Sequence, residues 1–109
     1  MAELIDLKEV EERVILIGVQ TSEEDDTMNC LNELEELVKT AGAATVDKII
    51  QNRERIHPGT YLGKGKIEEV KERIWELDAT GVVCDDELSP AQLRNLEQAL
   101  DTKVMDRTM

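Results

Sequence analysis

The sequence has 109 residues, a length typical of one domain and sufficient for a modest core. Hydrophobic residues make up 40% and charged residues 35%, and no apolar run is long enough to span a bilayer, so the composition excludes a disordered chain and a membrane-spanning one. The first residues lack the basic segment and apolar core of a signal peptide, so we expect a cytoplasmic protein.

The formal net charge of -12 argues against nucleic-acid binding over the whole surface. With Trp75 and Tyr61 as the only Trp, Tyr or Phe residues, a stacking platform for single-stranded nucleic acid is also excluded. The charge is uneven, however, and a local basic island can still meet a polyanion. Residues 48–66 form such an island, with Lys48, Arg53, Arg55, Lys64 and Lys66 against Glu54.

We divide the chain into an acidic leader, residues 1–12, and an α/β domain, residues 13–109. Residues 13–20, RVILIGVQ, are an unbroken apolar and β-branched run, which predicts a strand buried on both faces of a parallel sheet. A helix follows within residues 21–43, because apolar side chains recur at helical spacing and glycine ends the pattern. Its predicted inner face contains Leu31, Leu34, Val38 and Ala41, widened by Leu37.

Residues 44–51 predict a second strand, and residues 52–65 a long loop without periodicity. A second helix is predicted from Lys66 onward, with Trp75 expected at the edge of the core. Its apolar face would contain Ile67, Val70, Ile74 and Leu77.

Residues 81–87 begin with a third apolar strand, and residues 102–106 predict a fourth. Between them, Ser89 is placed as a helix N-cap, Pro90 as the first helical residue and Gln92 as the second half of a capping box. Alternation of strands and helices predicts a small doubly wound α/β domain with a four-stranded parallel sheet and helices on both faces. Function in such sheets lies outside the carboxyl ends of the strands.

The glycine-rich stretch HPGTYLGKGKIEE, residues 57–69, lies at that edge and resembles a phosphate-binding loop. It is one residue shorter than the Walker pattern and has glycine where that pattern has a Ser or Thr hydroxyl. It also departs from the dinucleotide-binding fingerprint, because Glu68 stands in place of the third glycine. A weaker hypothesis remains, in which open backbone N–H groups at a helix N-terminus hold one phosphate. The candidate residues for phosphate or RNA contact are Arg53, Arg55, Tyr61, Gly63, Lys64, Gly65 and Lys66. The alternative is a glycine-rich turn whose lysines serve solubility.

Acidic residues at the end of the third strand are weak candidates for magnesium, which prefers carboxylate ligands. The candidates are Asp86 and Glu87. The alternative is that one of these carboxylates bonds the neighbouring loop or helps to cap the next helix. His57 has no nucleophile placed beside it by the sequence, so we expect no catalytic residue.

Three segments, TYLGKGKIEEVKE, DDELSPAQLRNLEQAL and KVMDRT, resemble in order and spacing the N-terminal domain of the HflX family of ribosome-associated GTPases. The resemblance covers nearly the whole chain from Arg13 onward. It implies that a helical hairpin and a GTPase domain, which binds GTP and magnesium, follow this domain in the intact protein. It also implies docking on the large ribosomal subunit and its rRNA, and a role in splitting or rescuing ribosomes. We expect this chain to be the N-terminal domain alone, with no cofactor of its own.

Three functions remain open. The first is a docking module whose basic loop contacts rRNA phosphates. The second is a weak ATP-binding domain, with residues 63–66 on phosphate and Asp86 or Glu87 on magnesium. The third is a domain that only restrains the GTPase domain through its helical faces.

Overall fold

The computed structural model describes residues 12–108, so most of the predicted acidic leader lies outside the described residues. The four strands are separated by three helices, in the alternating order that the sequence predicts. The elements are β1 (Glu12–Gln20), α2 (Thr27–Thr40), β2 (Ala43–Asn52), α3 (Lys64–Leu77), β3 (Gly81–Cys84), α4 (Pro90–Leu100) and β4 (Lys103–Met105). None of the helices in this part of the chain is long and apolar enough to cross a membrane.

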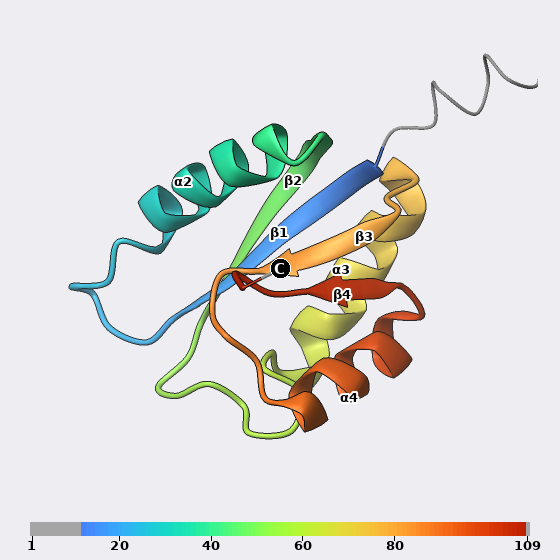
Figure 1. Cartoon of the computed structure of the whole chain (residues 1–109). Helices are drawn as coiled ribbons and strands as arrows, with labels where there is room; N and C mark the ends of the chain where they lie inside the picture. The colour runs from blue at the N-terminus through green and yellow to red at the C-terminus, as the bar shows by residue number, and fades with distance from the viewer. Residues whose placement is uncertain (1–11, 109) are drawn as a thin grey trace, which may run out of the picture.

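The strands form one parallel sheet in the order β2-β1-β3-β4, which confirms the predicted doubly wound architecture. Helix α2 covers one face, and α3 and α4 cover the other (Figure 1). The direction of the crossovers reverses between β1 and β3. The edge of the sheet outside the carboxyl ends of these two strands is therefore the topological switch point.

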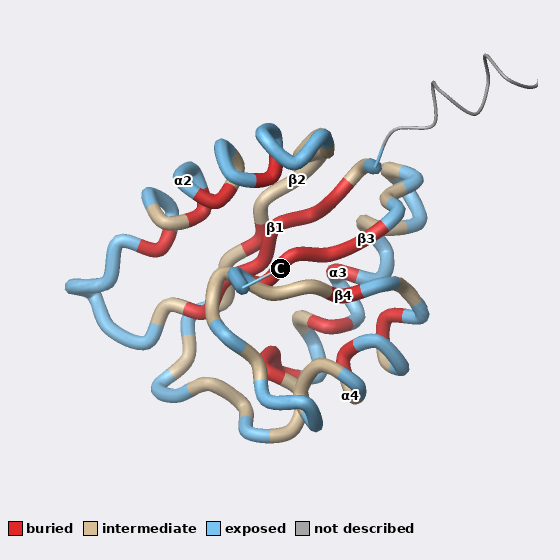
Figure 2. Tube along the Cα trace, viewed as in Figure 1, coloured by how far each residue is buried: buried red, intermediate tan, exposed pale blue. Residues whose placement is uncertain are grey.

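Strand β1 lies in the middle of the sheet and is buried on both faces (Figure 2). Val14 and Leu16 pack with α2, whereas Ile15, Ile17 and Val19 pack in the larger core beneath α3 and α4. This two-sided burial explains the unbroken apolar run in the sequence, because each face of the strand meets a different hydrophobic layer.

The start of α4 follows the sequence prediction closely. The Ser89 hydroxyl accepts a hydrogen bond from the Gln92 backbone N–H, and the Gln92 side chain accepts one from the Ser89 N–H. Pro90 occupies the first turn, where a missing N–H is harmless. The predicted capping box is therefore confirmed.

Three details of the helices differ from the predictions. Helix α3 begins at Lys64 rather than Lys66, because Gly63 is the N-cap and Gly65 lies in the first turn. Trp75 is not at the edge of the core, since the residue is 87% exposed. Leu37 and Ala41 are also exposed, because α2 presents only a narrow stripe to the sheet.

Candidate functional site

The loop that joins β2 to α3 is built around two buried residues, Tyr61 and Leu62. Tyr61 has a positive φ of 67° and is fully buried in the core under α3 and α4. Its hydroxyl donates a 2.7 Å hydrogen bond to Oδ2 of Asp86, and burial raises the pKa of the phenol far above its usual range. The candidate role of Tyr61 in RNA contact is therefore wrong for this conformation, because no part of its side chain reaches the surface.

His57 organises the turn that precedes Tyr61. Its Nδ1 accepts hydrogen bonds from the backbone N–H groups of Gly59, at 3.0 Å, and Thr60, at 3.1 Å. The backbone of His57 also pairs with that of Tyr61 in a short antiparallel bridge. An imidazole nitrogen that accepts two backbone hydrogen bonds is a structural cap for the turn.

Helix α4 holds this loop from the side through two amide side chains. Nε2 of Gln92 donates to the His57 carbonyl and Nδ2 of Asn95 donates to the Gly59 carbonyl, both at 2.9 Å. The sequence indicates Gln92 only as a helix cap and gives no sign of the role of Asn95. A polar residue beside the apolar stripe of a helix carries no signal that its partner lies 36 residues earlier in the chain.

The N-terminus of α3 is the point where the basic loop meets a helix dipole. The Gly63 N–H donates to Oε1 of Gln51 at 2.8 Å, so this N–H is not open to a ligand, contrary to the prediction. Gly63 has no side chain with which to cap the helix. A Cβ at Gly63 would collide with the Arg53 guanidinium, so glycine lets this cation lie directly over the N-cap. The first-turn N–H groups, at Lys64, Gly65 and Lys66, belong to the positive end of the helix.

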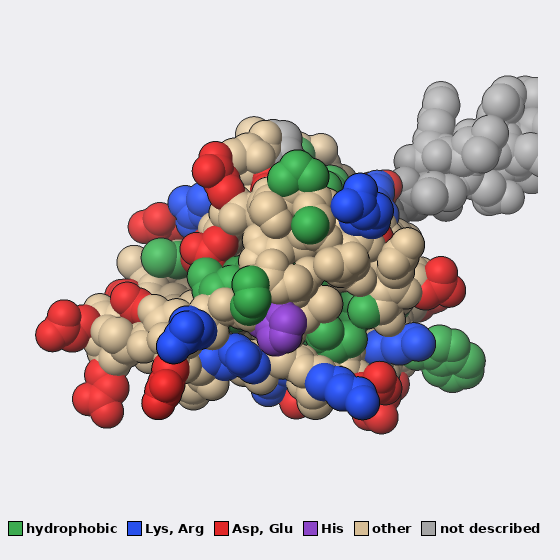
Figure 3. Space-filling model, turned by 90° about the horizontal axis from the view of Figure 1, so that it is seen from below, with side chains coloured by type: hydrophobic (Ala, Val, Ile, Leu, Met, Phe, Trp, Pro, Cys, Tyr) green, Lys and Arg blue, Asp and Glu red, His purple; other side chains and the backbone are tan. Residues whose placement is uncertain are grey.

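The five cations of the island are not equivalent. Lys48 pairs with Glu35 at 2.7 Å, and Lys66 pairs with Glu69 at 3.1 Å, so both carry a local counter-charge. Nε of Arg53 donates to the Arg55 carbonyl at 3.0 Å, which holds the two arginines of the loop together. The side chains of Arg55 and Lys64 are exposed. Figure 3 shows Lys and Arg side chains on both sides of the single histidine on this underside of the molecule.

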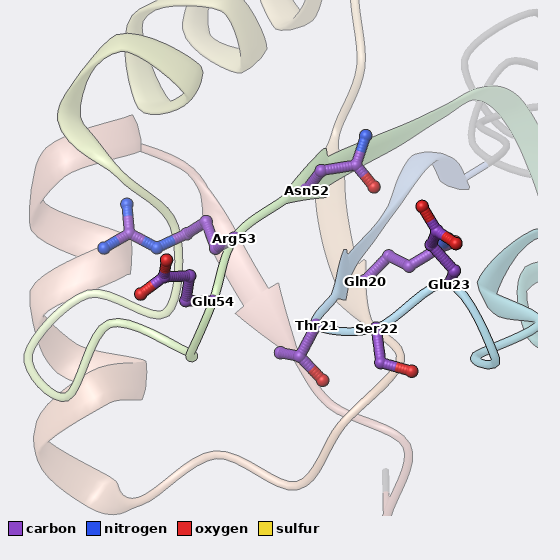
Figure 4. Close-up of a pocket in the computed structure, with 7 residues that line it drawn as sticks. All are labelled: Gln20, Thr21, Ser22, Glu23, Asn52, Arg53 and Glu54. Carbon is purple, nitrogen blue, oxygen red and sulfur yellow. The ribbon is translucent and has the colours of Figure 1, made fainter.

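A cleft of about 580 Å³ lies at the carboxyl ends of β1 and β2 (Figure 4). The Arg53 side chain turns away from Thr21 and Ser22 and extends over the loop before α3. The cleft therefore offers hydroxyl and amide groups, with its cation directed toward the α3 N-terminus. Its lining residues are Gln20, Thr21, Ser22, Glu23, Asn52, Arg53 and Glu54.

The topological switch point, by contrast, is bridged by the segment that follows β4. Nη2 of Arg107 lies 2.7 Å from Oδ1 of Asp85, and its Nε donates to the Asp85 carbonyl at 2.9 Å. The hydrogen bond with Asp85 raises the pKa of Arg107. Oδ2 of Asp106 accepts from the Leu88 N–H at 2.9 Å, which ties the same segment to the loop before α4.

Of the two magnesium candidates that follow β3, one is engaged in a contact within the domain and the other is exposed. Asp86 accepts a hydrogen bond from the Tyr61 hydroxyl, which is the alternative role of bonding the neighbouring loop. Glu87 is exposed. Within residues 12–108, no group of three or more His, Cys, Asp or Glu side chains gathers in a way that could hold a metal ion.

Comparisons with known proteins place the sequence of this chain in a family. The family model "GTP-binding GTPase N-terminal" matches residues 28–109. The chain is 81% identical over 109 residues to a GTPase HflX from Lacrimispora saccharolytica, covering 100% of this chain and 26% of that protein.

More distant members of the same group agree over most of the chain. A GTPase HflX from Caldanaerobacter subterraneus subsp. tengcongensis is 43% identical over 97 residues, covering 89% of this chain and 22% of that protein. One from Escherichia coli is 35% identical over 105 residues, covering 96% of this chain and 24% of that protein. The chain thus spans about a quarter of the length of these relatives. By these sequence matches, the chain belongs to the GTP-binding GTPase N-terminal family and is the N-terminal domain of an HflX GTPase.

Proposed function

We propose that this domain docks a longer, GTP-binding HflX protein on the large ribosomal subunit in the cytoplasm, where the intact protein splits or rescues ribosomes. The domain itself is not catalytic, and GTP and magnesium belong to the GTPase domain. Arg53, Arg55 and Lys64 contact rRNA phosphates, supported by Lys66 and the backbone of Gly65.

The observation that carries the proposal is the junction of Arg53 with the α3 N-terminus. The guanidinium lies over Gly63, and the first-turn N–H groups of the helix begin at the next residue. A helix N-terminus and an arginine fork both favour phosphate oxygens, and the two lie together on the basic loop. Structured RNA is commonly recognised through such backbone contacts rather than through base sequence.

The rigidity of the loop supports the same function. Tyr61, Gln92 and Asn95 fix its backbone from the core and from α4, so the cations sit on a preorganised support. Binding to a rigid RNA surface then orders few additional side chains, which limits the entropic cost of association. The acidic remainder of the domain discourages contact with RNA through other faces.

The test measures binding of the isolated chain to purified large ribosomal subunits over a range of salt concentrations. The variant Arg55→Ala/Lys64→Ala is compared with Lys39→Ala/Lys103→Ala, which removes the same charge from the amino-terminal end of the sheet. We expect only the first variant to lower the affinity. Its plot of log affinity against log salt concentration should also be flatter, by roughly one to two released counterions. Equal affinities and salt slopes for the two variants would remove the loop as an RNA contact.

The β1/β2 cleft supports a second candidate, a weak ATP-binding function. Its volume of about 580 Å³ is within the range of small-ligand sites, and Thr21, Ser22 and Asn52 could hydrogen-bond a ribose or base. Glu23 and Glu54 line the same cleft and oppose phosphate groups. A titration of the isolated chain with Mg-ATP, followed by amide NMR, decides this candidate. It fails if the amides of residues 20–23, 52–54 and 63–66 do not shift at millimolar ligand.

A further inference from the structure

Trp75 is the only tryptophan of the chain, and the residue is 87% exposed on the outer side of α3. The helix already has a complete inner face, because Ile67 and Val70 are buried and Ile74 and Leu77 pack against the same core. The indole therefore plays no part in holding α3 on the sheet. A large aromatic group in water is unfavourable, and such residues are frequent anchors of protein interfaces.

The surroundings of Trp75 are acidic. Glu68, Lys71 and Glu72 lie on the preceding two turns and form with the indole a hollow of about 300 Å³. Glu72 and Lys71 are three and four residues before Trp75, so their side chains lie beside the ring on the helix surface. Asp78 follows one turn later. Two carboxylates and one ammonium group thus line the hollow beside the ring, and Asp78 adds a third carboxylate at the end of the helix.

We propose that this acidic surface, Glu68, Glu72 and Trp75, docks an arginine- or lysine-bearing segment of a separate protein. A guanidinium over the indole face gains cation–π attraction, and its remaining N–H groups reach flanking carboxylates. The aliphatic stem of the same side chain covers the apolar ring.

Charge disfavours the other occupants. RNA phosphates meet carboxylates at this surface, whereas the basic loop lies at the opposite, amino-terminal end of α3. A second copy of the chain carries the same net charge of -12 and the same acidic surroundings, so self-association through Trp75 is repulsive. The two ends of α3 thus carry opposite charge and fit partners of opposite sign.

The sole tryptophan makes the test direct, because its fluorescence reports on this surface alone. The chain is titrated with an arginine-rich peptide that lacks tryptophan, and with a glutamate-rich peptide and an oligoribonucleotide of similar length. We expect a saturable change of Trp75 emission and protection from acrylamide with the arginine peptide only. In Glu68→Gln/Glu72→Gln the affinity falls by roughly fivefold or more, the effect of losing two solvent-exposed charge pairs.

The matched control is Glu23→Gln/Glu24→Gln, which removes two exposed carboxylates from the loop before α2, at the far end of the domain. We expect this control to keep the wild-type affinity. Three outcomes would each overturn the proposal. They are an equal loss of affinity for the arginine peptide in both variants, no emission change with that peptide, and a response to the oligoribonucleotide instead. A last measurement uses the full-length protein without any peptide and compares it with its Trp75→Phe variant. If Trp75 is already protected from acrylamide there, the surface is covered by the protein's own remaining domains, and the proposal is overturned as well.

Discussion

The Tyr61 hydroxyl donates a 2.7 Å hydrogen bond to Oδ2 of Asp86, and this contact joins the basic loop to the carboxyl end of β3. It brings together residues 25 positions apart in the sequence. The phenol ring fills the core while its oxygen bonds Asp86, just beyond the end of β3. The loop is therefore part of the folded core rather than a free segment between two elements.

We expect Tyr61→Phe to lower the free energy of unfolding by about 1–3 kcal/mol, because it removes a hydrogen bond to a partly buried carboxylate and keeps the ring. Urea denaturation of the isolated chain measures this change. Phe keeps the packing of the ring, so an unchanged urea midpoint would show that the hydrogen bond is not stabilising.

Gly63 and Gly65 lie two residues apart at the start of α3, and we expect substitution by alanine to change the stability of the domain in opposite directions at the two positions. A Cβ at Gly65 meets no heavy atom within 4 Å, and this residue lies within α3. We therefore expect Gly65→Ala to stabilise the domain by roughly 0.5–1 kcal/mol through helix propensity. Gly63→Ala displaces the Arg53 guanidinium and approaches Gln51, so we expect lower stability and weaker binding to large subunits. Denaturation curves of both variants measure the two changes in stability. A more stable Gly63→Ala variant would contradict the close packing of the Arg53 guanidinium on Gly63.

Asp106 gives the domain a pH-dependent contribution to stability. Burial alone would raise the pKa of its carboxyl group, but hydrogen bonds from Leu88 and Thr108 outweigh burial and lower the pKa below 3.8. The folded state therefore binds fewer protons than the unfolded state near that pH. The contribution is fully present above the unfolded pKa and is lost as pH falls through the lower folded pKa.

We expect Asp106→Asn to be less stable than the wild type above about pH 5, with the difference closing below about pH 4. Urea denaturation at a series of pH values measures it. Asp101→Asn is the control for removing one negative charge, since Asp101 has a positive φ that asparagine also adopts. A stability difference that is independent of pH would show that the Asp106 carboxylate charge makes no contribution.

Asn95→Ala tests the support that α4 gives to the loop. Loss of the hydrogen bond to the Gly59 carbonyl removes about 1 kcal/mol from local stability, so we expect the Tyr61 amide to exchange its hydrogen about fivefold faster. Hydrogen–deuterium exchange read by NMR measures this rate. Gln98→Ala, at an exposed position of the same helix, is the control, and equal rates in the two variants would mean that Asn95 does not hold the loop.

The sequence was sufficient for the fold because local patterns agreed with the global arrangement. The apolar run of β1 indicated a strand with a hydrophobic layer on each face, and the structure has two such layers. Ser89, Pro90 and Gln92 determined the start of α4 through contacts within one turn. Strands that alternate with helices are joined by right-handed crossovers, and this predicted the parallel doubly wound sheet.

The candidate site was only partly accessible to sequence reasoning. The sequence located the basic loop and its glycines, because charge and glycine content are local properties. It placed Tyr61 among the surface contacts and Trp75 at the edge of the core, whereas Tyr61 is fully buried and Trp75 is exposed. Each lies beside an apolar residue in the sequence, so the pattern alone did not tell which of the two aromatic rings entered the core.

Sequence alone therefore determined the order of the elements, the capping of α4 and the position of the basic loop, since these depend on residues close together in the chain. Only the tertiary structure decided that Tyr61 anchors the loop on Asp86 and that Arg53 lies over Gly63. It also decided that Arg107, in the segment after β4, pairs with Asp85 at the switch point. The Arg53–Gly63 and Arg107–Asp85 pairs are 10 and 22 positions apart in the sequence, and the Tyr61–Asp86 pair is 25 apart. Burial and hydrogen bonding between such distant residues arise only once the strands have paired and the helices have packed on the sheet.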